Sequence, residues 1–298
     1  MARVQNRGLD HLVIAVRDLE AAQTAYRLLG FKTTPVAHHP WGTSNFLVQM
    51  DRFFLEIIAV TDDSRLLPAA PRFFSFGDYL NEYLKQDEGF AMLVFESFDA
   101  AADRDEFAEK QLSDFDRFDF ERQAVQPDGT SATVGFSLAF VAPPDLPKAV
   151  FFTCQQHAPQ YFWKPDYQKH PNGALGIGAV AMVSDEPAAL RPLMEALQGT
   201  DNVLDDGDKS LLMTGTDRGW VNVHSPESAR SWYGEDLDVT LEEGPRLFGA
   251  RIAVADLATT ESHLKVNDVP CAWTRAGLTV DRGFLYGMTL AFVQAPES

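Results

Sequence analysis

The sequence predicts an α+β protein made of four βαβββ modules, which pair into two cup-shaped mixed β-sheets with helices on the outside. One observation is a repeat: the hexapeptide IAVRDL at residues 14–19 returns as IAVADL at 252–257, and looser copies occur at 181–185 and 94–99. A second is that each copy is a short apolar run ending in an aspartate that opens a helix-like segment. A third is that strand-like runs follow the first helix.

The first module can be assigned element by element. An alternating apolar run at residues 12–16 predicts a strand, and Asp18 can accept hydrogen bonds from the free amides at the start of a helix over 19–29. Gly30 ends that helix. Three strand-like runs then follow, at residues 31–36, 44–50 and 53–60.

The same order recurs along the rest of the chain. The later modules occupy residues 91–156, 177–224 and 248–293. A helix over 77–85 connects the first two modules, and the aromatic, polar segment 158–172 separates the second from the third. We therefore expect two domains of two modules each, at residues 1–160 and 171–298. Two paired modules curl one sheet into a cup lined by alternate side chains, which suits a small-molecule site.

Charge and composition exclude several classes of function. Lys and Arg number 25 against 43 Asp and Glu, a formal charge of −18, so nucleic acid and anionic membrane surfaces are poor partners. The two cysteines, Cys154 and Cys271, lie far apart and suggest neither a disulfide framework nor a zinc ribbon. No apolar run approaches a spanning helix. P-loop, dinucleotide-binding and serine-hydrolase motifs are absent from the sequence, so we expect no nucleotide cofactor and a soluble, cytoplasmic protein.

Two polar residues interrupt apolar strands in the first module. Glu56 lies within the apolar run 53–60, where an unpaired carboxylate would cost several kcal/mol and so needs a cation, hydrogen-bond donors or a proton. The period of two places His11 on one face with Val13 and Ala15, away from the helix. Each residue is either a satisfied core group or a contact to metal or substrate, and the residues alone leave both open.

Several motifs resemble a known superfamily. LDHLVIAV at residues 9–16 and FLEII at 54–58 resemble the vicinal oxygen chelate superfamily, which includes glyoxalase I, extradiol dioxygenases and bleomycin-resistance proteins. HPWGTSN at 39–45, CQQH at 154–157 and HPNGA at 170–174 are similar to the glyoxalase-like domain proteins. The resemblance covers nearly the whole chain. It implies a divalent metal held by the first and fourth strands of paired modules, with positions open for a substrate that has adjacent oxygens.

The resemblance also assigns candidate ligands. His11 matches the first-strand ligand and Glu56 the fourth-strand ligand, while His157 or Gln155 would complete an oxygen and nitrogen set suited to Zn, Ni, Mn or Fe. The sequence departs from the pattern at Met92, which takes the place of His11 in the second module. Without a metal, Glu56 would act instead as a general base.

The loops offer candidate substrate contacts. Thr43 and Asn45 begin a strand and can form hydrogen bonds to substrate, whereas His39 and Trp41 in the preceding loop are rim, cap or turn residues. Segment 158–172 could close the cup or join the two domains, and we favour the joining role.

An acidic stretch with interspersed phenylalanines runs over residues 99–121. It lacks the spacing of a calcium-binding loop, so we expect a solvated helix face with buried phenylalanines.

The leading hypothesis is a glyoxalase-like enzyme for a small-molecule substrate, a divalent-metal-dependent isomerase or lyase acting next to a carbonyl. Two alternatives stay open: a metal-free binding protein of the bleomycin-resistance type, and a relative of ring-cleaving dioxygenases. We expect the site of the second domain to be degenerate. A homodimer is also consistent with the resemblance.

Overall fold

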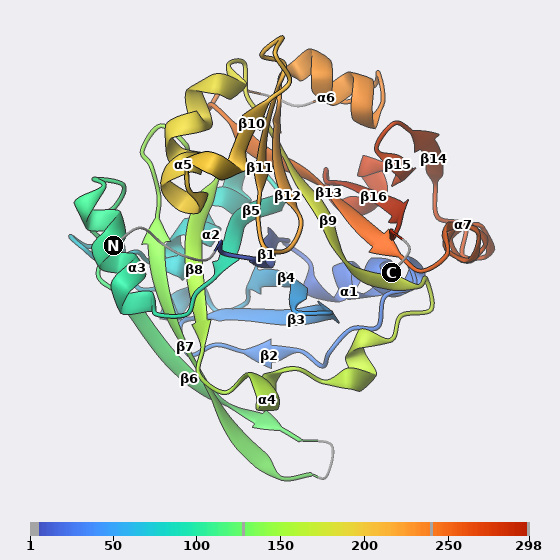
Figure 1. Cartoon of the computed structure of the whole chain (residues 1–298). Coiled ribbons are helices and arrows are strands. Elements are labelled where there is room, and N and C mark those ends of the chain that lie inside the picture. Colours follow the sequence, from blue (N-terminus) through green and yellow to red (C-terminus); the bar gives the residue numbers. More distant parts are fainter. Residues whose placement is uncertain (1–5, 127–128, 239–240, 297–298) are drawn as a thin grey trace.

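The order strand, helix, strand, strand, strand occurs four times in the protein (Figure 1). The structure is a computed structural model that describes residues 6–126, 129–238 and 241–296. The predicted α+β class and its four βαβββ modules are confirmed.

The first two modules form one half of the molecule. The first consists of β1 (Leu9–Ala15), α1 (Leu19–Leu28), β2 (Ala37–His38), β3 (Thr43–Met50) and β4 (Phe53–Val60). Helix α2 (Phe76–Gln86) leads to the second, which consists of β5 (Gly89–Glu96), α3 (Ala100–Glu109), β6 (Phe118–Val125), β7 (Ser131–Val141) and β8 (Val150–Gln156).

The other two modules follow a short helix, α4 (Pro159–Phe162). The third consists of β9 (Ala174–Val183), α5 (Arg191–Gln198), β10 (Val203–Asp205), β11 (Leu211–Gly215) and β12 (Trp220–His224). Helix α6 (Pro226–Tyr233) precedes the fourth, which consists of β13 (Arg246–Val254), α7 (Leu257–Val266), β14 (Cys271–Thr274), β15 (Gly277–Val280) and β16 (Thr289–Gln294).

Each pair of modules makes one eight-stranded mixed sheet that curls into a cup. The first sheet has the order β2-β3-β4-β1-β5-β8-β7-β6, and the second repeats it as β10-β11-β12-β9-β13-β16-β15-β14. The first strands of the two modules, β1 and β5, pair antiparallel at the centre, and each also pairs parallel with the last strand of its own module. Two pairs of parallel strands, one from each module, therefore lie side by side at the centre of the sheet.

Strand β1 separates the two faces of the first sheet as its alternation predicts. Leu12 and Ile14 belong to the core under the helices, whereas Val13 and Ala15 belong to the apolar cluster inside the cup. The core under the helices continues into the second sheet through residues such as Val180, so the two halves share one core.

Three of the four repeated aspartates start helices as predicted. The side chains of Asp18, Asp99 and Asp256 accept hydrogen bonds from backbone amides in the first turns of α1, α3 and α7. The prediction is wrong for Asp185. There the chain enters a 3₁₀ turn at Pro187–Leu190 before α5, and the Ser184 hydroxyl accepts the amide of Glu186 instead.

The predicted strand at residues 31–36 is also wrong. Only Ala37–His38 pair with β3. Phe31 is buried in the core beside Tyr26, and the Thr34 side chain accepts the hydrogen bond of the Leu47 amide at 2.9 Å. A hydroxyl thus replaces the backbone carbonyl that a continuing ladder would use.

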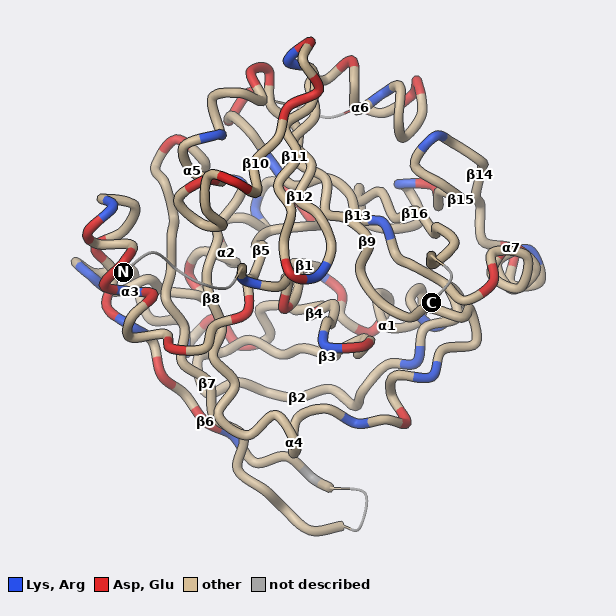
Figure 2. The backbone as a smooth tube through the Cα atoms, in the orientation of Figure 1, with Lys and Arg blue, Asp and Glu red and all other residues tan. Residues whose placement is uncertain are grey.

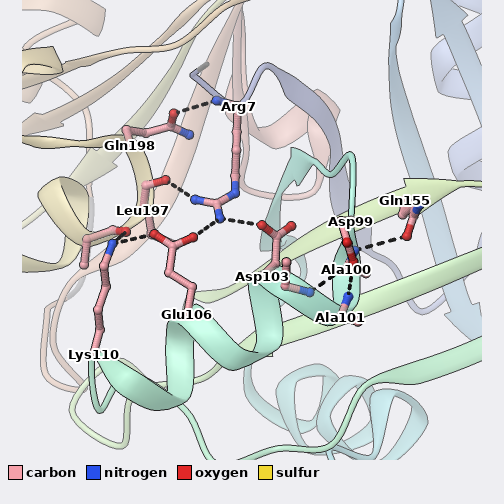
Figure 3. Close-up of polar contacts among 12 residues, drawn as sticks. Arg7, Asp99, Ala100, Ala101, Asp103, Glu106, Lys110, Gln155, Leu197 and Gln198 are labelled. Carbon is pink, nitrogen blue, oxygen red and sulfur yellow. Dashed lines mark hydrogen bonds and ion pairs between the residues drawn. The ribbon is translucent and has the colours of Figure 1, made fainter. Parts of the chain in front are cut away.

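Arg7 joins the two halves of the molecule through contacts with residues of α3 and α5, as Figure 3 shows. Its side chain is 1% exposed, and its Nη2 lies 2.6 Å from Asp103 and 2.8 Å from Glu106 on α3. Its Nη1 donates to the carbonyl of Leu197 on α5 at 2.6 Å, and its backbone amide donates to Gln198. The N-terminal segment therefore connects the outer helices of the first and second sheets.

Charged residues concentrate on the outer helices and loops, and the central strands are largely free of them (Figure 2). Among the residues that the structure describes, no helix has the length and apolar character needed to cross a membrane.

The cup of the second sheet is filled only in part by its own side chains, and a cavity of about 380 Å³ remains beside Tyr233 and Leu237. Tyr233 and Leu237, from α6 and the residues that follow it, pack on Phe248 and Ala291. His224 is fully buried beside them, with its Nδ1 2.9 Å from the Ser228 hydroxyl.

The titration of His224 should make the second half sensitive to acid. Burial, together with the charges of Arg251 and Arg275, lowers the pKa of His224 to about 4. The unfolded chain binds this proton near pH 6.5 and the folded chain does not, so stability is complete above pH 6.5 and falls as the pH drops toward 4. We expect a loss of roughly 3 kcal/mol across that window. Urea unfolding of the wild type and of His224→Gln at several pH values checks this: the variant should lack that slope, and equal slopes would contradict the assignment.

Candidate functional site

A small pocket lies inside the cup of the first sheet. Its volume is about 60 Å³, room for a small chemical group or a few waters. Its polar groups come from His11, His39, Asn45, Glu56 and Arg122. The rest of its wall is mostly aromatic and apolar: Trp41, Leu47, Phe54, Phe76, Phe118, Phe120, Phe136, Leu138, Phe152, Cys154 and Phe162.

A larger groove of about 790 Å³ adjoins the pocket on its outer side. The two cavities share the side chains of Asn45, Leu47, Arg122 and Phe162 as a common boundary. A molecule could therefore place a small part in the pocket and a larger part in the groove.

His11 and Glu56 meet at the bottom of the pocket because β1 and β4 are adjacent parallel strands, with Val13 opposite Glu56. Nε2 of His11 lies 3.7 Å from Oε2 of Glu56. Nδ2 of Asn45 donates to the other carboxylate oxygen, Oε1, at 2.5 Å. Both His11 and Glu56 are buried. One oxygen of Glu56 is thus held by an amide, and the other faces an imidazole.

Asp10, which the sequence analysis missed, orients His11. Its Oδ1 lies 2.5 Å from Nδ1 of His11, and its Oδ2 accepts a hydrogen bond from Gln156 at 2.9 Å. Because an ionised carboxylate only accepts, it holds a proton on Nδ1 and leaves Nε2 as the atom that faces Glu56. Phe54 stacks on the ring, with 4.2 Å between ring centroids. Asp10 and Phe54 therefore fix the position of the imidazole ring.

His39 and Trp41 form part of the pocket wall, as does Asn45, whereas Thr43 does not line it. Thr43 instead holds His39, whose Nδ1 lies 2.8 Å from the threonine hydroxyl. The ring of Trp41 stacks on the His39 imidazole, with 4.8 Å between ring centroids. Burial lowers the pKa of His39. The negative charge of Glu56 raises this pKa and the positive charge of Arg122 lowers it, and the net shift is downward, so His39 is neutral at pH 7.

Gln155 and His157 lie outside the pocket. Gln155 turns to the helical face of the sheet, where it accepts from the Ala100 amide and donates to the Phe98 carbonyl. His157 follows the end of β8, and its Nε2 lies 2.8 Å from the Ser137 hydroxyl. The pocket-facing residues of β8 are Phe152 and Cys154, one position out of register with the prediction.

The donor set does not fit a resident divalent metal. In the first module, Val13 of β1 lies opposite Glu56 of β4. In the second module, the equivalent residue Val94 of β5 lies opposite Phe152 of β8, so a phenylalanine occupies the place of Glu56. Met92 takes the place of His11, and burial raises the pKa of the Cys154 thiol well above its usual value. Within the described ranges, no three His, Cys, Asp or Glu side chains are arranged to hold a metal ion. Catalytic metals commonly have three protein ligands, and among the described residues His11 and Glu56 supply two.

The acidic stretch contributes more to the pocket than the sequence analysis predicted. Helix α3 ends at Glu109, and the chain returns as strand β6, whose Phe118, Phe120 and Arg122 all line the pocket. The prediction of one helical face is wrong for this part. The alternation at 118, 120 and 122 was the available signal for a strand.

Segment 158–172 both closes the pocket and joins the two halves. Phe162 lines the pocket, and Trp163 packs against Phe54. Asn172 donates to the carbonyl of Leu29, and its own carbonyl accepts from Thr260 on α7. The favoured joining role is therefore present, and the alternative, closing the cup, is present beside it.

The paired βαβββ modules form the cup-shaped fold that the resemblance to the vicinal oxygen chelate superfamily implied. The family model described as "Glyoxalase-like domain" matches residues 9–198, and the chain belongs to that family. A search of the curated proteins gave no match.

Solved structures resemble the chain at low sequence identity. A hypothetical protein from Staphylococcus aureus has a TM-score of 0.63 at 12% identity, over 97% of this chain and all 100% of that one. A mutant of 4-hydroxymandelate synthase from Streptomyces coelicolor has a TM-score of 0.53 at 12% identity, over 91% and 78%. A xylose isomerase-like TIM barrel/4-hydroxyphenylpyruvate dioxygenase fusion protein has a TM-score of 0.51 at 14% identity, over 90% and 40%. These likenesses concern the fold alone.

Proposed function

We propose that this protein is a small-molecule enzyme that moves a proton at a carbon next to a carbonyl group, as an isomerase or a lyase does. One observation carries the proposal. A buried carboxylate, Glu56, has one oxygen held by Asn45 and the other beside an oriented imidazole, inside an aromatic pocket. Such a carboxylate is positioned to act as a general base.

In the proposed reaction, Oε2 of Glu56 takes a proton from the substrate carbon, and the electron pair of the broken C–H bond passes to the carbonyl oxygen as an enolate. Asn45 keeps Oε1 occupied, which fixes the direction of the free oxygen. For a substrate with a hydroxyl on the carbon that lost the proton, the enolate oxygen takes the hydroxyl proton and Glu56 returns its proton to the former carbonyl carbon, which completes an isomerisation. For a substrate with a leaving group on the carbon β to the carbonyl, the carbonyl re-forms as that group departs with its bonding electron pair, which completes an elimination. The aromatic wall excludes water, which strengthens the electrostatic interactions that stabilise the enolate.

The resemblance led us to expect a metal-dependent form of this reaction. With two converging donors instead of three, we assign the proton transfer to Glu56 itself and derive no step through a metal. Activity that is lost on dialysis against a chelator and restored by Zn, Ni, Mn or Fe would overturn this assignment.

The test measures exchange of carbon-bound protons with solvent. A panel of small 2-oxo acids, ketones and aldehydes is incubated with the protein in D₂O, and deuterium incorporation next to the carbonyl is followed by NMR. We expect exchange above the buffer rate for at least one compound, unchanged after treatment with a chelator. Exchange at the buffer rate for the whole panel would contradict the enzyme proposal.

A metal-free binding protein is the second candidate. This candidate is favoured because the polar side chains of the site already have hydrogen-bond partners within the protein: His11 is paired with Asp10, and Glu56 with Asn45. The expected result for this candidate is a ligand that raises the melting temperature without any exchange or product formation.

A further inference from the structure

Four of the described residues line both the pocket and the outer groove, and Arg122 is the charged one among them. It projects from β6 on the same face as Phe118 and Phe120. Arg122 thus lies at the boundary between the two cavities, which Asn45 and Phe162 also line.

No described residue forms an ion pair or side-chain hydrogen bond with this guanidinium. Burial lowers the pKa of Arg122, and the charge of Glu56 acts on it only through space. Arg7, also buried, shows how this protein satisfies an arginine elsewhere, with Asp103 and Glu106 both within 2.8 Å. A partly buried cation without a partner is costly, so Arg122 is suited to receive an anion from outside the chain.

The groove around Arg122 is positively charged although the protein as a whole carries −18. Its other charged lining residues are Lys32, Lys164 and Asp166. Lys32 lies over the ring of Tyr167 at 5.6 Å, and Asp166 is 3.7 Å from Lys169. An anionic molecule would therefore meet an attractive local field at the entrance to the site.

We propose, on the basis of the proposed function, that the substrate is a carboxylate whose acid group binds Arg122 while its carbonyl carbon enters the pocket beside Glu56. The planar fork of a guanidinium matches a carboxylate with two parallel hydrogen bonds. The pocket of about 60 Å³ admits only the reacting end, and the groove of about 790 Å³ holds the remainder. The substrate class is thus an oxo acid with an extended or bulky tail.

The experiment uses two probes of nearly equal shape, phenylacetate and its neutral amide, phenylacetamide. Neither has a ketone, so binding is measured apart from turnover, by titration with NMR detection up to millimolar probe. We expect wild type to prefer the carboxylate. Arg122→Gln should weaken phenylacetate binding about tenfold or more and leave phenylacetamide unchanged. Arg122→Lys should retain part of the preference.

Arg117→Gln serves as the control, because Arg117 precedes the same strand but pairs with Asp119 at 2.8 Å on the surface. It should bind both probes as wild type does. Equal binding of the two probes by wild type, no carboxylate binding by the folded wild type, or an unaltered preference in Arg122→Gln would each overturn the proposal.

The same variants separate this proposal from the enzyme proposal. Suppose that the wild type prefers the carboxylate, that this preference depends on Arg122, and that no panel compound exchanges protons. This result would support the anion-site proposal and refute the enzyme proposal. Exchange on 2-oxo acids that Arg122→Gln leaves unchanged would support the enzyme and refute the anion site.

Discussion

Glu56→Gln is expected to lower proton exchange about 100- to 10,000-fold, the range over which a positioned general base contributes. The amide has nearly the shape of the carboxylate, and its oxygen can still accept the Asn45 hydrogen bond that is 2.5 Å long in the wild type. It cannot take up a proton at the other position. The measurement is deuterium incorporation into the best compound of the panel, with melting temperature as the check on folding.

Glu121→Gln is the matched control for this substitution. Glu121 is exposed on β6, next in sequence to Arg122, and does not line the pocket. Its substitution by Gln removes the same charge from the protein as Glu56→Gln does. Its exchange rate should equal that of the wild type. If Glu56→Gln also kept the wild-type rate, Glu56 would not be the base, and the proposed mechanism would fail.

The fold could be predicted from the sequence because its signals are local and repeated. The aspartates that follow the first strands mark where a strand gives way to a helix, and three of the four act as expected. The exception, Asp185, is followed by a proline-initiated 3₁₀ turn, where the Ser184 hydroxyl accepts the amide of Glu186 instead. Residues 31–36 do not form the predicted strand, because the Thr34 hydroxyl accepts the hydrogen bond of the Leu47 amide, a tertiary contact that no periodicity reports.

The site could be predicted only in part. His11 was placed by strand alternation, but its meeting with Glu56 rested on the resemblance, because two parallel strands are adjacent through tertiary pairing and not through spacing. On β8 the alternation was hidden, since Phe151 and Phe152 are both buried and the two faces look alike in sequence. Arg122 was missed because it follows an acidic stretch that resembles a solvated helix.

Arg7→Ala should destabilise the protein by about 3–5 kcal/mol, the usual cost of removing one partner of a buried ion pair. The loss would leave Asp103 buried without a counter-charge and free the Leu197 carbonyl, and it would uncouple α3 from α5 (Figure 3). Urea unfolding measures the change.

Arg17→Ala is the control for this last prediction, because Arg17 pairs with Glu88 at 3.1 Å on the surface with 51% of its side chain exposed. Exposed pairs contribute about 1 kcal/mol or less. The double variant Arg7→Met with Asp103→Leu should recover much of the stability. It removes both charges of the buried pair together, and the two apolar side chains fill the space that the pair occupied. If the double variant were no more stable than Arg7→Ala, the cost would lie in lost packing and in the Leu197 contact, and the ion pair would not be what holds the two halves together.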